Sequence, residues 1–230
     1  MKILPLSFYK RNDVVEIAKD LLGKIIVTEF DGLLTTDRIV ETEAYAGCKD
    51  KASHAYGNRR TGRTEVMFGT PGRAYVYLCY GIHHLFNVVT NMPGTPHAVL
   101  IRAVEPVKGT EIMQQRTGKI EPGYSITRGP GNVSRALGIK TIHTGYNLLT
   151  SQLIIKDDGF VFDSNLIQQT PRIGVAYAGE DALLPYRFFI RNNKYVSGKK
   201  SPVFITGTPK NQKSNKSARS LCSLVFIIVV

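Results

Sequence analysis

Two stretches of this chain of 230 residues decide its fold: RIVETEAYAG at residues 38–47 and RAYVYLCYGIHHLFN at residues 73–87. Side chains of an extended strand alternate between its two faces. The first stretch therefore places Glu41, Glu43 and Tyr45 on one face, so that a carboxylate and an aromatic ring share a wall.

In the second stretch, the same alternation places Tyr75 and Tyr77 on one face and Tyr80 on the other. Gly81 then weakens the strand and indicates a bend. If the two strands adjoin, their tyrosines sandwich a flat ligand beside the carboxylate. Tyr75 could equally be a core residue, and we leave it outside the predicted site.

Turn and helix signals organise the rest of the chain. The pair Asp31-Gly32 separates two β-like runs, which predicts a tight hairpin. Residues 12–22 have apolar side chains at helical spacing, and residues 110–116 and 133–138 are also predicted to be helical. Further strands are predicted at residues 74–80, 86–92, 97–106, 152–158, 172–177 and 186–190.

No alternation of strands and helices typical of a parallel sheet occurs, and no repeat or linker divides the first 197 residues. We therefore predict a mixed α/β (α+β) domain over residues 1–197, built on a curved, mainly antiparallel, barrel-like sheet flanked by helices. Residues 198–230 are basic and poor in large apolar side chains until their end, which predicts a disordered tail.

The charge balance favours a polyanionic partner. The formal net charge is +12, and it remains +6 for residues 1–197 when the six cations of the tail are left out. Nucleic acid is the first candidate, and improved solubility is the alternative.

Cysteine content and hydropathy favour an intracellular location. Cys48, Cys79 and Cys222 form an odd set without metal-site spacing, so neither a disulfide framework nor a zinc site is predicted. Residues 220–230 are apolar but too few to cross a bilayer, which needs about 18 residues or more. We expect a cytoplasmic protein in a bacterium or a nuclear one in a eukaryote; membrane attachment rests on this tail alone.

A longer series of motifs is specific. In order, they are ETEAY (41–45), DKASHAY (50–56), RTGRTEVMFGTPG (60–72), YVYLCYG (75–81), FNVVT (86–90) and VLIRAVEP (99–106). Together with RGPGNVSRALGI (128–139) and RIGVAYAGEDALLPYRFFI (172–190), the series resembles the alkyladenine (3-methyladenine) DNA glycosylase family. The resemblance covers nearly all of residues 5–197.

The resemblance implies that Glu43 is the general base, which activates water against the sugar C1′ of a nucleotide turned out of the duplex. We expect this carboxylate to lie in a partly solvated, positively charged groove. Glu41 is the alternative base, but family position favours Glu43 and gives Glu41 a structural role.

The resemblance also implies a pocket for the base. Tyr45, His54 and Tyr77 match the family's pocket residues, and stacking and cation–π attraction suit a flat, cationic alkylated purine. For His54, capping a turn is the alternative. Asn87 matches the position that screens the exocyclic group of guanine, and Arg102 a basic contact to the nucleotide.

Tyr80 matches the side chain that the family inserts to fill the gap left by the flipped nucleotide. Asn132 and Thr64 stand where the family often has Lys and Asn, which puts DNA affinity in question. The adjacent His83 and His84 point to opposite faces of a strand, so no metal is predicted.

No lysine matches a Schiff-base nucleophile, so the expected enzyme is monofunctional and has no lyase activity. Neither a nucleotide-binding motif nor another cofactor site is present in the sequence. The implied substrate is double-stranded DNA carrying 3-methyladenine, 7-methylguanine, ethenoadenine or hypoxanthine, bound by a monomer. The alternative is a non-catalytic nucleic-acid-binding module, because the family's fold resembles a tRNA-contacting domain of methionyl-tRNA formyltransferase.

Overall fold

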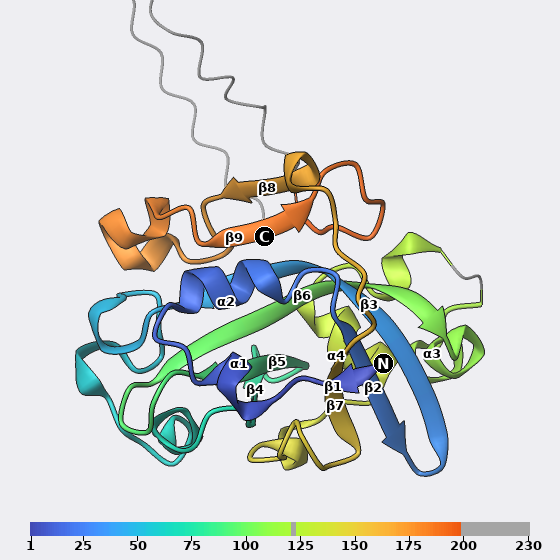
Figure 1. Ribbon diagram of the computed structural model, residues 1–230, viewed down its shortest axis with the longest axis horizontal. Helices are drawn as coiled ribbons and strands as arrows, with labels where there is room; N and C mark the ends of the chain where they lie inside the picture. Colours follow the sequence, from blue (N-terminus) through green and yellow to red (C-terminus); the bar gives the residue numbers. More distant parts are fainter. Residues whose placement is uncertain (121–122, 199–230) are drawn as a thin grey trace, which may run out of the picture. The chain divides into compact units, whose positions relative to one another are not determined.

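Strand β3 (Leu33–Tyr45), which contains the first stretch, is the centre of the sheet. In the computed structural model, which describes residues 1–120 and 123–198, β3 pairs with β2 (Ile25–Phe30) on one edge and with β6 (His97–Lys108) on the other (Figure 1). On the same edge as β2, but nearer the end of β3, β9 (Arg187–Ile190) pairs with residues 41–43. The segment with both glutamates therefore has a strand on each side.

The other strands extend this sheet: β1 (Lys2–Ile3), β4 (Ala74–Cys79), β5 (His83–Thr90), β7 (Leu153–Asp157) and β8 (Ile167–Thr170). The strand order is β1-β7-β2-β3-β6-β5-β4, with β9 on β3 and β8 on β9, and every pair is antiparallel. The sheet curls into a half-barrel, so the predicted fold class is confirmed.

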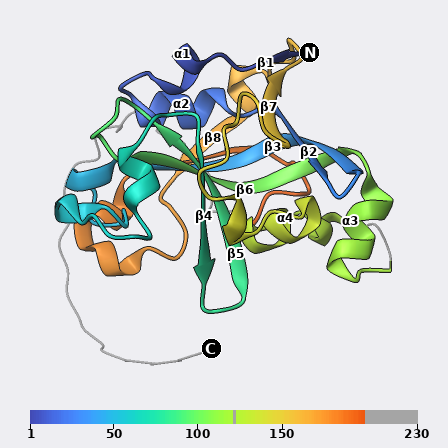
Figure 2. The same ribbon diagram turned by 90° about the horizontal axis from the view of Figure 1, so that it is seen from below.

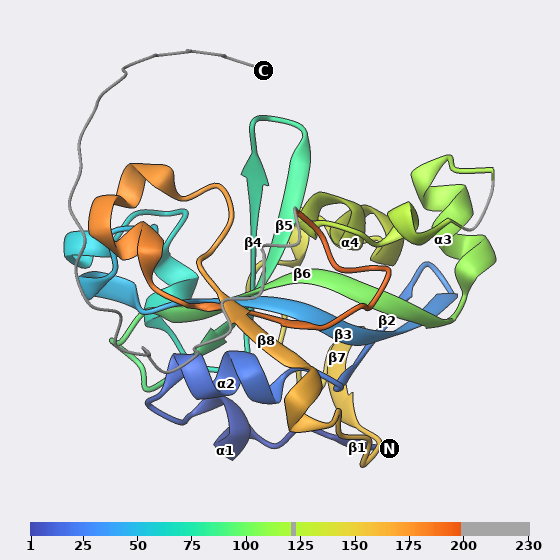
Figure 3. The ribbon, with the colours of Figure 1, turned by 90° about the horizontal axis from the view of Figure 1, so that it is seen from above.

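Helices cover both faces of the sheet. They are α1 (Leu6–Tyr9), α2 (Val14–Asp20), α3 (Thr110–Thr117) and α4 (Pro130–Leu137). Figure 3 shows α2 on one side of β3 and β6, and α3 and α4 on the other. The Thr42 hydroxyl donates to the Ala18 carbonyl of α2, so Glu41 and Glu43 point to the face opposite α2.

Local signals explain several of these elements. The Asp13 carboxylate accepts hydrogen bonds from the amides of Val15 and Glu16, which caps α2. Asp31 and Gly32 both have positive φ (55° and 72°), which is typical of a type I′ turn, so the predicted hairpin is confirmed. Helix α4 begins at Pro130, earlier than predicted, because proline fits the first helical turn.

One predicted strand is wrong. Residues 172–177 form no strand; they lead into a 3-10 segment, η7 (Ala176–Leu183). The reason is that the backbone of this segment bonds to side chains: the Ile173 amide donates to Glu43, and Gly174 has a φ of 78°. The apolar residues of this segment favour a strand, but its backbone forms a hydrogen bond with a carboxylate and not with a neighbouring strand.

The described residues also form six further 3-10 turns: η1 (Gly47–Lys49), η2 (Tyr56–Asn58), η3 (Glu65–Phe68), η4 (Tyr124–Ile126), η5 (Thr141–His143) and η6 (Ser164–Leu166). The first three lie together beside the sheet (Figure 2). The β4–β5 hairpin projects between them and α4. Of the predicted tail, 198–230, all residues after Gly198 lie outside the described residues.

Candidate active site

The Glu43 carboxylate is bound by three groups from three parts of the fold. Its Oε1 accepts a hydrogen bond from the Ile173 amide at 2.8 Å, and its Oε2 accepts one from the Tyr45 hydroxyl at 2.8 Å. Nη1 of Arg102, on the neighbouring strand β6, lies 3.3 Å from Oε1. All three groups are donors, and a carboxylate is an acceptor that such donors suit.

The expectation of a partly solvated Glu43 is wrong, because its side chain is fully buried. Burial of a charge is unfavourable unless the charge is paired and hydrogen-bonded, and here Arg102 and two donors supply both. Tyr45, Arg102 and Ile173 all line a cavity of about 370 Å³. Glu43 therefore lies directly beneath the wall of this cavity, one hydrogen bond away from it.

The cavity brings together all the other predicted site residues. It is lined by Tyr45, His54, Tyr77, Tyr80, Asn87 and Arg102, among others. Its size is within the range of about 300–1,000 Å³ that small-molecule sites span. Residues from β3, β4, β5 and β6 thus meet at one place, although 57 positions separate Tyr45 from Arg102 in the sequence.

Aromatic rings form one wall of the cavity. The centroids of His54 and Tyr77 lie 4.6 Å apart with an interplanar angle of 80°, and those of Tyr75 and Tyr77 lie 5.6 Å apart. Arg63 lies over the Tyr77 ring and Arg172 over the Tyr45 ring, at 4.7 Å and 4.8 Å from the centroids. Each ring is therefore in cation–π contact with a guanidinium.

The two pocket tyrosines are held neutral. Burial, followed by the charge of Glu43, raises the pKa of Tyr45 well above its usual value. Burial likewise raises the pKa of Tyr77. Both hydroxyls therefore remain hydrogen-bond donors across the physiological pH range.

His54 is a neutral imidazole at physiological pH. Burial, together with the charges of Arg63 and Arg59, lowers its pKa to about 4. Nη2 of Arg63 lies 3.2 Å from Nε2 of His54 and 3.5 Å from Nδ1. Nδ1 forms a hydrogen bond with the Tyr75 hydroxyl at 2.7 Å.

Tyr80 lies at the tip of the β4–β5 hairpin, which projects from the body of the protein (Figure 2). Its side chain is 90% exposed, and its φ of 50° is followed by a φ of 72° at Gly81. The direction of the ring is therefore set by the turn and not by strand alternation, because β4 ends at Cys79. The turn presents an aromatic side chain to the outside next to the cavity.

Asn87 is buried, and its position is fixed by two hydrogen bonds. Its amide nitrogen donates to the carbonyls of Tyr75 and Leu85, at 3.2 Å each. Both amide hydrogens are thereby used, so the side chain cannot turn freely. It is a rigid part of the cavity wall and suits a role in excluding a substituent of the base.

Some residues of the cavity were not predicted. Tyr75 was left outside the site, but its hydroxyl bonds to His54 and its ring lines the cavity. Its place on the same strand face as Tyr77 was a signal that could have included it. Ile173 contacts Glu43 through its backbone amide, for which the sequence has no signal. Tyr177 also lines the cavity, but it was assigned to the predicted strand 172–177, which does not form.

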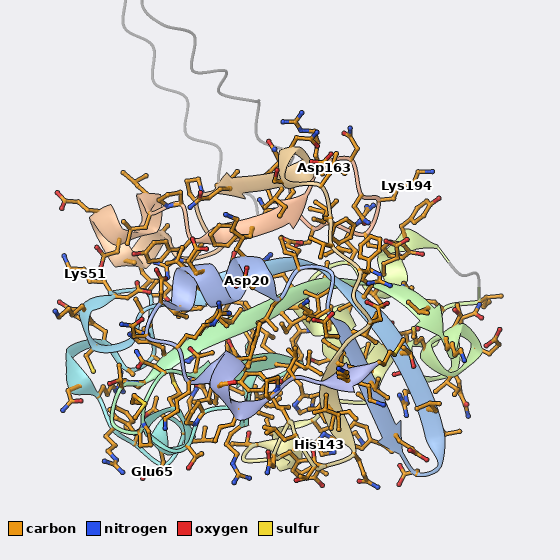
Figure 4. All side chains as sticks on the ribbon, viewed as in Figure 1. Asp20, Lys51, Glu65, His143, Asp163 and Lys194 are labelled. Atoms are coloured by element: carbon orange, nitrogen blue, oxygen red, sulfur yellow. The ribbon has the colours of Figure 1, made fainter. Side chains whose placement is uncertain are left out.

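Cations gather beside the cavity. A second hollow of about 450 Å³ shares His54, Arg63 and Tyr177 with it, and Lys51 and Arg59 also line this hollow. Figure 4 shows Lys51 at the same side of the view as Glu65, which is paired with Arg60.

Metal-binding and membrane-spanning features are absent from the described part of the chain. Residues 1–120 and 123–198 hold no group of three histidine, cysteine, aspartate or glutamate side chains suited to a metal ion. In the same residues, no helix is long and apolar enough to reach across a bilayer. Nδ1 of His84 accepts a hydrogen bond from the Thr141 amide, His83 packs against Gly131, and both histidines line one hollow beside α4.

Comparison with known proteins identifies the family. The family model for methylpurine-DNA glycosylase matches residues 7–194. The chain belongs to the methylpurine-DNA glycosylase family. It is 46% identical over 193 residues to a protein of Chlamydia felis and 45% identical over 203 residues to one of Bacillus cereus, each named "Putative 3-methyladenine DNA glycosylase". The alignments cover 84% and 85% of this chain and 98% of each relative.

A protein of Desulfitobacterium hafniense with the same name is 43% identical over 208 residues, which are 86% of this chain and 100% of that protein. The predicted family resemblance is thereby confirmed. The chain is a DNA glycosylase of the methylpurine family, an enzyme that hydrolyses N-glycosyl bonds in DNA. Membership favours the enzyme over the non-catalytic binding module.

Proposed function

We propose that this methylpurine-family glycosylase removes alkylated or deaminated purines from double-stranded DNA, by flipping the damaged nucleotide and attacking its C1′ with a water activated by Glu43. The observation that carries the proposal is the contact between Glu43 and the Tyr45 hydroxyl, because it joins a buried carboxylate to the wall of an aromatic cavity. A general base must lie close to the nucleotide on which its activated water acts.

The cavity supports selection of damaged purines. Two tyrosine rings and a neutral imidazole line the cavity, and electron-rich ring faces attract a base that alkylation has made cationic. A protonated His54 would repel such a ring, and its lowered pKa avoids this. The candidate bases are 3-methyladenine, 7-methylguanine, ethenoadenine and hypoxanthine.

Glu43 fits the role of general base. Oε2 accepts one hydrogen bond, from Tyr45, and a carboxylate oxygen can accept two. A water held at the remaining position would face the cavity wall, where C1′ of a flipped nucleotide would lie. Arg102 pairs with this carboxylate, which would take the proton from the water in this mechanism.

The exposed Tyr80 supports base flipping. Unstacking a nucleotide costs a few kcal/mol, least at a damaged pair, and an aromatic ring inserted into the gap offsets part of this cost. Among the described residues, the ones that line the cavity include no lysine, which favours a water nucleophile and a monofunctional enzyme. We propose that the protein acts as a monomer.

The proposal is tested with purified protein and duplexes that each carry one of the four candidate bases. After incubation, abasic sites are detected by alkaline cleavage, and cleavage without alkali reports lyase activity. Base release from at least one duplex without strand cleavage supports the proposal. A correctly folded protein that releases none of the four bases refutes it.

A further inference from the structure

Behind Glu43 lies a second buried carboxylate, Glu41, which is part of a network of charges. Glu41 is fully buried, and its Oε1 accepts hydrogen bonds from Nε of Arg102 at 2.9 Å and from Nε of Arg187 at 2.7 Å. Glu41 and Glu43 lie on the same face of β3 and share Arg102. Two carboxylates and two guanidiniums therefore neutralise one another in the interior.

Ser197 completes the network from the far end of the described chain. Its amide donates to Oε2 of Glu41 at 2.7 Å, and its hydroxyl lies 3.1 Å from both Nη2 of Arg102 and Oε1 of Glu41. Its carbonyl accepts from Nη2 of Arg187 at 2.7 Å. One serine, 154 positions after Glu43, thus bonds to the three charged residues behind the site.

This network limits how Arg102 contacts Glu43. Nε of Arg102 is committed to Glu41 and Nη2 to Ser197, so that Nη1 alone approaches Glu43, at 3.3 Å. A guanidinium free to turn would form a bidentate pair with Glu43, which is the geometry that arginine and carboxylate prefer. Such a pair would occupy the acceptor positions of Glu43 and weaken it as a base.

We propose, building on the proposed function, that Glu41 is a positioning residue: with Ser197 it holds Arg102 in a one-sided contact with Glu43 and balances the charge of Arg187. Residues 41 and 197 thereby keep Arg102 away from the acceptor positions of Oε2 of Glu43. Glu41 has this role in addition to supporting the fold.

The pH dependence of the reaction reports this role. The charged and titratable groups that face Glu43 come from five elements: Tyr45 (β3), Arg102 (β6), Arg172 (the segment before η7), Tyr177 (η7) and Arg187 (β9). Glu41, which shares Arg102 with Glu43, is the nearby negative charge; Glu41→Gln removes it and leaves these cations unchanged. The excess positive charge favours the ionised form of Glu43, so activity should persist to lower pH although the maximal rate falls.

The experiment measures single-turnover base release from the best duplex substrate of the wild type, from about pH 5 to about pH 9. For Glu41→Gln, we expect a maximal rate reduced about tenfold or more. We expect the midpoint of its acid limb to move down by about one pH unit. Glu41→Asp keeps the charge, so its rate should fall while the midpoint stays at the wild-type value.

Asp37→Asn is the matched control. Asp37 is a fully buried carboxyl on the same strand, but it touches neither Arg102 nor Glu43, so its variant should keep both the rate and the midpoint. A folded Glu41→Gln protein with an unchanged midpoint overturns the proposal. If that variant does not fold, Ser197→Ala decides, because it keeps every charge: a reduced rate supports the proposal, and a wild-type rate overturns it.

Failure of this inference is distinguishable from failure of the proposed function. An inactive wild type, or a Glu43→Gln variant as active as the wild type, refutes the proposed function itself. An active wild type, an inactive Glu43→Gln variant and an unmoved midpoint in Glu41→Gln refute only the role of Glu41.

Discussion

Replacing Tyr80 by glycine should separate stability from activity. Tyr80 has a φ of 50°, and this left-handed conformation costs a residue with a side chain roughly 1–2 kcal/mol. Glycine removes that strain but loses about 0.5–1 kcal/mol through its greater freedom in the unfolded chain. Because the Tyr80 ring is 90% exposed, its removal forfeits little packing. The free energy of unfolding should therefore stay the same or rise by about 1 kcal/mol, which is about 2–4 °C in Tm.

Base excision should fall in the same variant. Stacking of a base on an aromatic side chain contributes about 1–3 kcal/mol, which corresponds to a rate loss of about fivefold to about 150-fold when the wedge is absent. Single-turnover release from a lesion duplex measures the rate, and thermal unfolding measures the stability. Val161→Ala, which also shortens an exposed apolar side chain, is the control and should change neither. A Tyr80→Gly protein that excises at the wild-type rate would refute insertion by this residue.

Three further predictions concern buried groups. Burial raises the pKa of Asp37 well above 3.8, so Asp37 stabilises the fold at low pH and this contribution is lost as the pH rises. Urea unfolding at several pH values should therefore show that Asp37→Asn gains stability relative to the wild type with increasing pH; a constant difference would contradict this. Because the pKa of His54 is about 4 in the folded state and 6.5 in the reference state, the wild type should lose stability as the pH falls through this window. His54→Gln should lose less, and equal losses in both proteins would argue against a neutral His54. Asn87→Ala should raise the release of guanine lesions relative to adenine lesions by about tenfold, measured by competition between two labelled duplexes, and an unchanged ratio would exclude Asn87 as the screen.

Strand periodicity was sufficient to predict the central geometry. Alternation along residues 41–45 placed Glu41, Glu43 and Tyr45 on one face, and Arg102 contacts both glutamates there. The hairpin turn at Asp31 was predictable because Asp-Gly favours the positive φ angles of a type I′ turn. The antiparallel order of the strands agrees with the absence of βαβ spacing.

The sequence could not predict contacts that depend on backbone groups or on long-range closure. The Ile173 amide binds Glu43, but an amide is common to nearly every residue and has no signature. Burial of Glu43 was likewise not predictable, because its compensation comes from Arg102 on another strand and from a segment 130 positions later. Residues 172–177 form no strand for a related reason: their backbone bonds to Glu43, which is distant in the sequence.

The most direct test of catalysis by Glu43 compares Glu43→Gln with the wild type on one lesion duplex. The amide side chain of this variant can still accept from the Ile173 amide and donate to the Tyr45 hydroxyl, so the fold and the binding of DNA should be retained. Loss of a general base reduces rates by about 10²–10⁴-fold. Glu29→Gln, on an exposed position of the adjacent strand, is the matched control and should excise normally. We predict that Glu43→Gln binds the duplex and releases no base within the time of many wild-type turnovers; release at the wild-type rate would contradict this role of Glu43.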